Sequence, residues 1–548
     1  MKVLIECASR NYQVYYRLCE VLHQQYSEAE FGYFSHVSLS DPLFQGSKDP
    51  RFSIYDPFNE ANLIFDHESN MNLIKKFEEF TGVTIWKMIA ADRLIGWNDH
   101  IGNYSTYINK NLRSDREYVI AKVANEIRGI SRMFNDFEPD IFIPAQKMGG
   151  ISVFILEGMC KASGVHYLIQ DISRISNLHR ITENAMMQSP EVNKDYESLM
   201  KKNDIESCSE GKKLHDDIKN DFSNLGNFDT DYLETYGLFE INNWTDGLRL
   251  FFEYISAQSI NIKNLLKSLI KLIISSKSDI KTIFHIFKIS LTIQALGYSN
   301  KRAALDKSFG KLPDDGQKYL YFPLYNIPEY SSNFQSTMWL NIVSAVEALS
   351  KSIPGDWIIV LKEHPTGLEY NYRQKDFYHQ LSRIPNVEFA PPLTNGNNLI
   401  KNAELVFVTV GTSGWEAILQ GIPVLSPVEC FWDCMDLSHR SSDIESLHED
   451  IKKAVEKNKK ISASEREKRI TFYLEALLSN SFPISDPEVF QYYYEGTHEQ
   501  YYKQGQELAD GFIKYFEKTY IYKSDGKKNY FQNEKKLPSQ HFSLISRS

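Results

Sequence analysis

A short run of small and hydroxyl-bearing residues, Gly411-Thr412-Ser413-Gly414, stands between an apolar segment and a stretch with helical periodicity. A helix that begins at such a turn exposes unpaired backbone N–H groups, and its dipole adds positive potential at the same end. Small residues let a phosphate approach this backbone closely. We therefore expect Gly411, Thr412 and Ser413 to bind phosphate, and Glu416, in the first helical turn, to accept from ribose hydroxyls. The alternative is an ordinary N-capped helix in which Glu416 complements the dipole.

A second candidate is Lys362-Glu-His-Pro365, which follows the apolar run 357–361. Proline prevents a helix from continuing and fixes the local chain, so it would hold His364 at the end of a buried strand. The imidazole can donate to a phosphate, and Lys362 can add positive charge. A lone His-Pro pair is more typical of a loop cap. Here this strand and the one before Gly411 should end on the same edge of one parallel sheet, which favours a binding role.

A third segment, Tyr321-Phe-Pro-Leu-Tyr-Asn-Ile-Pro-Glu-Tyr-Ser-Ser332, follows the first strand of the same region. Glu329 and Ser331 would reach the cleft between the two domains expected below. Composition alone favours a proline-rich turn with a helix N-cap, so these two residues are cleft candidates only.

Taken in this order, the three segments and Gly421-Ile-Pro-Val resemble bacterial capsular polysaccharide biosynthesis proteins, a group that includes the capsule Kdo transferases. The resemblance covers about residues 318–428. It implies a GT-B fold, metal-independent glycosyl transfer and a nucleotide-sugar donor bound as substrate by the second domain, with no cofactor. In related transferases that use CMP-activated acidic sugars, a His-Pro pair and a Ser/Thr turn hold the nucleotide. This role would fall to His364, Pro365, Thr412 and Ser413.

Glycosyl transfer also needs a base, or a carboxylate that stabilises developing positive charge, on the acceptor side. Asp171 is the first candidate because it follows an apolar segment that we expect to be a strand, 165–170. Asp99, in Trp97-Asn-Asp-His100, is the second. Asp171 could equally be a helix cap or an ion-pair partner of Arg174, which is itself a cleft candidate.

Alternating strands and helices must position these residues. In the C-terminal half we expect strands at 319–324, 357–362, 387–390, 405–410 and 423–425, with helices at 336–352, 377–384, 399–403 and 415–420. In the N-terminal part we expect strands at 1–8, 141–144 and 165–170, with helices at 12–26, 114–135 and 151–163. This alternation predicts parallel sheets, and hence an α/β chain of two Rossmann-like domains facing a cleft.

The chain of 548 residues is long enough for more than two units. We expect a Rossmann-like acceptor-side domain at 1–185, a mostly helical insertion or linker at 186–310, a Rossmann-like nucleotide-sugar domain at 311–480, and a helical C-terminal extension with a frayed tail at 481–548.

Charge and composition narrow the partners. The net charge is −10, whereas nucleic-acid-binding proteins are usually basic, so we expect no nucleic-acid partner. The six cysteines lack paired metal-ligand spacing, so we expect no metal site. No leader or spanning apolar stretch is visible, which indicates a cytoplasmic protein with reduced thiols. The expected partners are a nucleotide sugar and an oligosaccharide or lipid-linked glycan acceptor.

Basic charge concentrates at 246–296, which we expect to form two helices. Within them Leu, Ile and Phe alternate with six lysines, Lys263, Lys267, Lys271, Lys277, Lys281 and Lys288. One interpretation is a helical hairpin packed on the protein with solvated lysines. The other is an amphipathic surface that binds anionic lipid at the inner face of the cytoplasmic membrane.

Two other classes of function remain open. Sugar-nucleotide 2-epimerases share the two-domain architecture and similar His-Pro and Gly-rich segments. A degenerate, non-catalytic scaffold of capsule assembly is the third hypothesis, although the intact set from His364 to Glu416 argues against it.

Overall fold

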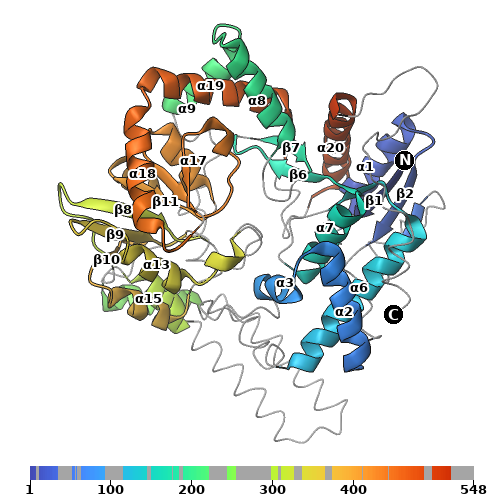
Figure 1. Cartoon of the computed structure of the whole chain (residues 1–548), viewed down its shortest axis with the longest axis horizontal. Helices are drawn as coiled ribbons and strands as arrows, with labels where there is room; N and C mark the ends of the chain where they lie inside the picture. Colours follow the sequence, from blue (N-terminus) through green and yellow to red (C-terminus); the bar gives the residue numbers. More distant parts are fainter. Residues whose placement is uncertain are drawn as a thin grey trace, which may run out of the picture.

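The computed structural model describes most of the chain in segments separated by gaps. The described residues are 1–7, 12–34, 52–55, 57, 63–92, 115–144, 150–175, 177–183, 189–220, 243–254, 298–306, 310–325, 336–364, 373–409, 411–441, 443–486 and 496–519. Figure 1 shows them as coloured ribbons that form two lobes joined near the middle.

Five parallel strands form the sheet of the first unit. In spatial order they are β3 (Phe52–Tyr55), β2 (Glu30–Phe34), β1 (Lys2–Glu6), β4 (Ile141–Ile143) and β5 (His166–Tyr167). The apolar residues Val3, Leu4 and Ile5 of the central strand β1 are all fully buried. Burial of consecutive residues is typical of parallel strands that are covered by helices on both faces.

Helices cover both faces of this first sheet. On one face, a core that includes Leu4 and Phe34 packs against α2 (His67–Thr81), α3 (Ile85–Ala91), α6 (Arg116–Phe137) and α7 (Ile151–Ser163). On the other face, Val3 and Ile5 pack with α1 (Tyr12–Gln25) and α20 (His498–Thr519). The left-handed Gly164 ends α7, as the sequence predicts.

The second unit has a parallel sheet of six strands. Their spatial order is β10 (Val387–Phe389), β9 (Trp357–Lys362), β8 (Lys318–Pro323), β11 (Leu405–Phe407), β12 (Val424–Ser426) and β13 (His439–Arg440). One face is covered by α13 (Ile342–Ser350), α15 (Lys375–Ser382) and α18 (Leu447–Lys460). The other is covered by α16 (Gly396–Lys401), α17 (Thr412–Leu419) and α19 (Ala463–Ser479).

The predicted α/β class with two Rossmann-like domains is therefore confirmed, with both sheets parallel throughout. Several boundaries differ from the prediction, and two of these differences change the element count. The strand at 424–426 is not the last, because β13 continues the sheet beyond it. The helix expected at 336–352 is split into the 3-10 helix η6 (Thr337–Trp339) and α13, because Asn341 caps the latter with its side chain.

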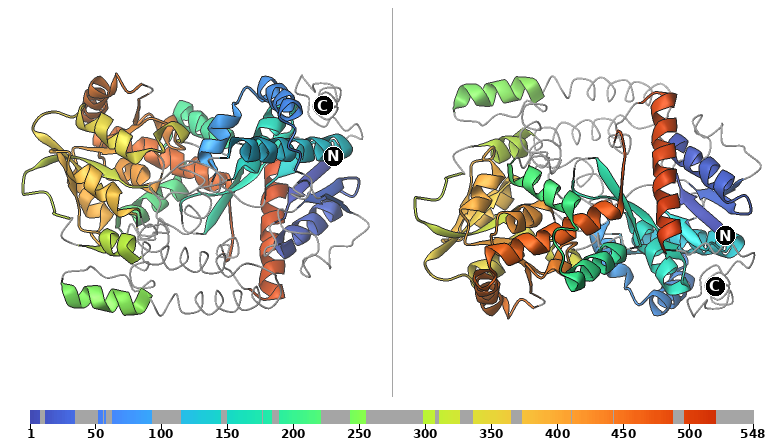
Figure 2. Two further views of the ribbon diagram at one scale, coloured as in Figure 1. Left: turned by 90° about the horizontal axis from the view of Figure 1, so that it is seen from below. Right: turned by 90° about the horizontal axis from the view of Figure 1, so that it is seen from above.

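A small antiparallel sheet lies between the two lobes and was not predicted. Its strands, in spatial order, are β14 (Ser481–Pro483), β7 (Leu178–Thr182) and β6 (Ile169–Ile172). The single strand expected at 165–170 is thus divided into β5, in the first sheet, and β6. After β14 the chain returns to the first unit, where α20 lies alongside α1 (Figure 2).

The predicted mostly helical insertion contains two helices whose bounds the sequence analysis did not give. α8 (Pro190–Lys202) and α9 (Ser209–Asn220) pack against α19 of the second unit. Residues 244–254 and 298–305 are also helical. The six lysines from 263 to 288 lie outside the described residues.

No helix in the described part of the chain is long and apolar enough to cross a membrane.

Candidate functional site

The carboxyl ends of β9, β8 and β11 meet at one edge of the second sheet. β8 lies between the other two, and every pairing among them is parallel. Neighbouring strands lie roughly 4.8 Å apart, so the ends of β9 and β11 are separated by about 10 Å. The two most specific motifs of the sequence therefore lie on either side of one short stretch of sheet edge, as predicted. The motif with His364 begins at the end of β9, and the motif with Ser413 lies at the start of α17.

Glu363, the residue after β9, holds this end of the strand in a buried polar network. Its side chain is 4% exposed, and one carboxylate oxygen accepts from the Arg373 Nε at 2.9 Å and from the Tyr378 hydroxyl at 3.0 Å. The other oxygen accepts from the backbone N–H of His364 at 3.0 Å. Arg373 also donates to the carbonyl oxygen of Tyr325, just beyond β8, at 2.7 Å. The network thus fastens two neighbouring strand ends together and fixes the backbone of His364.

His364 is half-buried at this edge and is uncharged at neutral pH. Burial first, and then the positive charges of Lys362 and Arg373, lower its pKa to about 3. A neutral imidazole carries one N–H and can donate one hydrogen bond. Lys362, at the end of β9, is buried, and its Nζ lies 3.4 Å from the carbonyl oxygen of Glu363. The environment of His364 is therefore cationic, which suits an anionic ligand.

The start of α17 offers backbone donors on the other side. The helix begins at Thr412, three residues earlier than the sequence predicted, and Gly411 is its N-cap. Gly411 has φ 120° and ψ 168°, a conformation that L side chains rarely adopt, and it has no side chain to satisfy the first N–H groups of the helix. Thr412 and Ser413, the first two residues of the helix, are half-buried.

Glu416 does not lie where the sequence analysis placed it. Because α17 begins at Thr412, Glu416 is in the second turn rather than the first, and its side chain is 5% exposed. A buried carboxylate one turn inside the helix is poorly placed for ribose hydroxyls at the helix end. The preceding turn of α17 is also packed tightly: a Cβ on Gly414 would lie 2.6 Å from the ring of Trp432.

Thr409 is a residue of this edge that the sequence analysis missed. It lies two residues after β11 and two before Gly411, and it is fully buried. Its hydroxyl has no hydrogen-bond partner among the described residues. An unsatisfied buried hydroxyl usually costs about 1–3 kcal/mol, so it is uncommon in a folded protein. Its position next to the Gly411 turn makes this hydroxyl a further candidate ligand donor.

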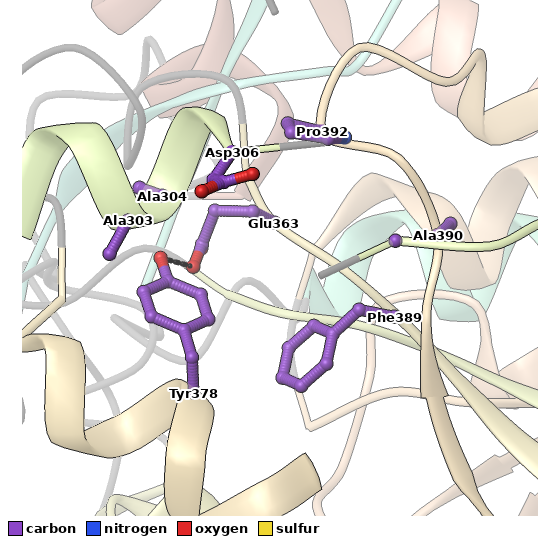
Figure 3. Close-up of a pocket in the computed structure, with 9 residues that line it drawn as sticks. Ala303, Ala304, Asp306, Glu363, Tyr378, Phe389, Ala390 and Pro392 are labelled. Carbon is purple, nitrogen blue, oxygen red and sulfur yellow. Dashed lines mark hydrogen bonds between the residues drawn. The ribbon is translucent and has the colours of Figure 1, made fainter. Parts of the chain in front are cut away.

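A small pocket lies behind the Glu363 network (Figure 3). It has a volume of about 20 Å³, which is room for about one water molecule. Glu363, Tyr378 and Asp306 line it, and Figure 3 shows the hydrogen bond between the first two. The pocket is too small for a nucleotide, so the sheet edge, and not this cavity, is the candidate binding surface.

The predicted position of Asp171 is wrong. It lies within β6, not beyond a strand end, and it is 1% exposed. One carboxylate oxygen accepts from the Arg180 guanidinium of β7 at 2.9 Å, and the other accepts from the backbone N–H of Ile172. The ion-pair partner is therefore Arg180 and not Arg174, which is half-buried in the turn after β6 with φ 59°. Both members of the pair are buried, so Asp171 faces no open cleft.

The remaining candidates lie outside the described residues. They are Asp99, Glu329, Ser331 and Pro365. Among the residues that are described, no three or more His, Cys, Asp or Glu side chains are grouped so as to hold a metal ion.

Some of the site residues that the sequence analysis missed lie within or next to a motif, and others do not. Glu363 stands inside the Lys-Glu-His-Pro motif, so a strand-end carboxylate next to a histidine could have been singled out. Thr409 precedes the Gly411 turn and could have been included with it. Arg373 and Tyr378 lie in a segment with no motif, and only the packing of α15 brings them to β9.

Comparisons with known proteins give structural matches alone. No family model matches the sequence, and no curated protein matches it. A UDP-GlcNAc 2-epimerase from Neisseria meningitidis, solved with UDP-GlcNAc, is 12% identical, with a TM-score of 0.22 over 86% of this chain and 94% of its own. The spinosyn rhamnosyltransferase SpnG, solved with spinosyn aglycone, is 10% identical, with a TM-score of 0.23 over 88% and 97%. The glycosyltransferase VinC, solved with dTDP, is 9% identical, with a TM-score of 0.22 over 88% and 96%. Similarity at this level supports no inference about the activity of this chain.

Proposed function

We propose that this protein is a glycosyltransferase that binds a nucleotide-activated sugar at the carboxyl edge of its second sheet. The observation that supports the proposal most is the convergence of three kinds of phosphate donor on that edge. They are the imidazole of His364, the hydroxyl of Thr409, and the backbone and hydroxyl groups at the start of α17. The imidazole stands on the loop after β9, and the other two donors stand on the segment that joins β11 to α17. A span of about 10 Å between β9 and β11 suits a nucleotide phosphate with part of its sugar.

The proposed chemistry follows from this arrangement. An acceptor hydroxyl oxygen attacks the anomeric carbon, and the bond between that carbon and the donor phosphate oxygen breaks. Negative charge then builds up on the leaving phosphate, where the N-terminus of α17 and the neutral His364 can stabilise it. The acceptor proton passes to a base. Since Asp171 is held by Arg180 in the connecting sheet, the proposal for this base moves to Asp99.

The finer assignment is also a proposal. The motifs His364-Pro365 and Thr412-Ser413 suggest a CMP-activated acidic sugar such as Kdo, and the resemblance of residues 318–428 suggests a capsule or other surface glycan as acceptor. We propose a cytoplasmic, metal-independent reaction.

Turnover of a donor panel tests the reaction class. The protein is incubated with CMP, UDP and GDP sugars, each with and without oligosaccharide acceptors and with and without EDTA. We expect one donor to be consumed only when an acceptor is present, and EDTA to have no effect. Isomerisation of a donor without acceptor would replace the proposal with an epimerase, and neither binding nor turnover of any donor would remove the enzyme assignment.

Calorimetry on single variants tests the site. His364→Ala and Ser413→Ala should each weaken nucleotide binding by about 10–150-fold, because a hydrogen bond to a charged group is worth about 1.5–3 kcal/mol. His379→Ala and Ser382→Ala, two exposed residues of α15, serve as matched controls and should bind as the wild type does. If both site variants keep wild-type affinity, the nucleotide does not bind at this edge.

A further inference from the structure

A tryptophan on the loop after β12 lies against the first turn of α17. This loop leaves the same edge of the second sheet as the Gly411 turn does, because β12 pairs with β11 in parallel. It leads to Trp432, the N-cap of the 3-10 helix η7 (Asp433–Met435). A Cβ on Gly414 would lie 2.6 Å from Cζ2 and 2.7 Å from Cη2 of the Trp432 ring. Only a glycine lets the ring approach the helix backbone this closely, so Trp432 is part of the surroundings of the candidate binding edge.

The indole N–H of Trp432 is buried and unused. The side chain is 1% exposed, and its Nε1 has no hydrogen-bond partner among the described residues. Nε1 is bonded to Cε2, the ring atom next to Cζ2, so the N–H stands beside the part of the ring that meets α17. Buried donors are almost always hydrogen-bonded in folded proteins, so an unused donor next to the start of a helix points to a ligand.

The groups that gather at this point determine which ligand chemistry suits them. The buried hydroxyl of Thr409, also without a partner among the described residues, precedes the same helix, and Val408 beside it lies within 2.9 Å of the Cβ position of Gly414. Indole and backbone N–H groups can only donate. The oxygens of an ionised phosphate can only accept, whereas a sugar hydroxyl brings a donor of its own. The arrangement therefore suits a phosphate better than a sugar hydroxyl.

We propose that the Trp432 N–H donates a hydrogen bond to a phosphate oxygen of the bound nucleotide and so favours a nucleotide over the corresponding nucleoside. This inference rests on the proposed function, because it adds a residue to the same binding edge. The N–H is covered in this structure, so the segment from Gly411 to Gly414 must shift outward as the phosphate enters. Space for this shift exists, since a Cβ on Gly411 would have no described atom within 4 Å.

Calorimetry with CMP, UDP and GDP, and with cytidine, uridine and guanosine as their phosphate-free counterparts, tests the proposal. Trp432→Phe keeps an aromatic ring against Gly414 and removes the N–H. We expect this variant to bind the nucleotide about tenfold or more weakly and to bind the nucleoside as the wild type does. Its melting temperature should be unchanged or higher, because no buried donor is left unpaired. Trp357→Phe, the same change at the opposite edge of the sheet where β9 begins, is the matched control and should keep wild-type affinity.

A second measurement reports on the N–H itself. With nitrogen-15 in the indole rings, each of the seven tryptophans gives one NMR signal, and the signal of Trp432 is the one that Trp432→Phe removes. The nucleotide should move this signal downfield, and the nucleoside should not. If Trp432→Phe keeps wild-type nucleotide affinity while His364→Ala and Ser413→Ala lose it, the edge binds the nucleotide without Trp432 and this proposal alone is wrong. If all three variants bind as the wild type does, the nucleotide binds elsewhere and the proposed site fails as well.

Discussion

Replacing Asp171 with asparagine should destabilise the junction between the two lobes rather than abolish catalysis selectively. Asp171 and Arg180 are 1% and 2% exposed, and their ion pair at 2.9 Å lies within the small antiparallel sheet. Removing one member of a buried pair costs about 3–5 kcal/mol because the other charge remains buried without compensation. Asparagine keeps an oxygen that can accept from Arg180, so we expect the lower end, about 3 kcal/mol.

The same loss of stability can be measured as a fall in the melting temperature. For units of 150–250 residues, 1 kcal/mol corresponds to about 2–4 °C, so Asp171→Asn should lower the midpoint by about 6–12 °C. Hydrogen exchange should place the loss at β6, β7 and β14. The apolar pair D171L/R180M should recover much of the stability, since neither charge is then buried.

Asp204→Asn, which changes an exposed carboxylate, is the matched control and should melt like the wild type. Turnover at a temperature where Asp171→Asn remains folded separates the two roles of the residue. An unchanged melting temperature together with lost turnover would refute the structural reading and restore Asp171 as the catalytic carboxylate.

Three further predictions concern the binding edge and the insertion. Thr409→Val should leave stability unchanged or slightly higher, because it removes an unsatisfied buried hydroxyl, while nucleotide affinity measured by calorimetry falls about tenfold or more. Nucleotide-sugar affinity should rise as pH falls below the pKa of His364 in the complex. Burial and the charges of Lys362 and Arg373 hold this pKa at about 3 in the free protein, and a bound phosphate raises it, so binding takes up a proton between the two pKa values. His364→Asn should abolish this uptake, measured by calorimetry in buffers of different ionisation enthalpy. Burial lowers the pKa of His215, on α9, to about 4, so the unfolded state binds a proton at higher pH than the folded state does. The free energy of unfolding should therefore be full above about pH 6.5 and should decline as pH falls toward 4. His215→Gln should flatten the dependence of the unfolding midpoint on pH.

Elements whose signals are local were predicted almost to the residue. The helix expected at 151–163 is α7 and the strand expected at 357–362 is β9, with the same bounds. The end of α7 depends on Gly164, which takes the left-handed conformation that glycine adopts readily. β9 depends on an unbroken apolar run between turn residues. Both signals lie within the element or at its border, so the sequence alone shows them.

The helices α8 and α9 were not located individually within the predicted insertion, because little of either is buried. In α8 only Val192 and Tyr196 are buried among thirteen residues, so its apolar periodicity is too sparse to recognise. A capping signal was nevertheless present. Ser189 is the N-cap, Pro190 occupies the first turn and Glu191 adds an acid there, which is the usual pattern at a helix start.

The surroundings of the site could not be predicted in the same way. Asp171 and Arg180 meet because β6 and β7 form a hairpin, and β14 joins them from a position about 300 residues later in the chain. No local pattern encodes such a pairing. The motifs at His364 and Ser413 were found from the sequence, whereas Arg373 and Tyr378 reach Glu363 only through the packing of α15.

The position of α20 bears on the order in which the protein can fold during synthesis. Leu508, Phe512 and Phe516 of α20 share a core with Val14 and Leu18 of α1, although nearly the whole chain separates them. The helices approach so closely that a Cβ on Gly505 would lie 2.6 Å from the carbonyl oxygen of Val14. While the ribosome is still making the second unit, this face of α1 has no cover. The N-terminal unit, the first to emerge, is therefore the last to be completed, and a ribosome stalled before residue 498 would hold a nascent chain with an exposed apolar helix.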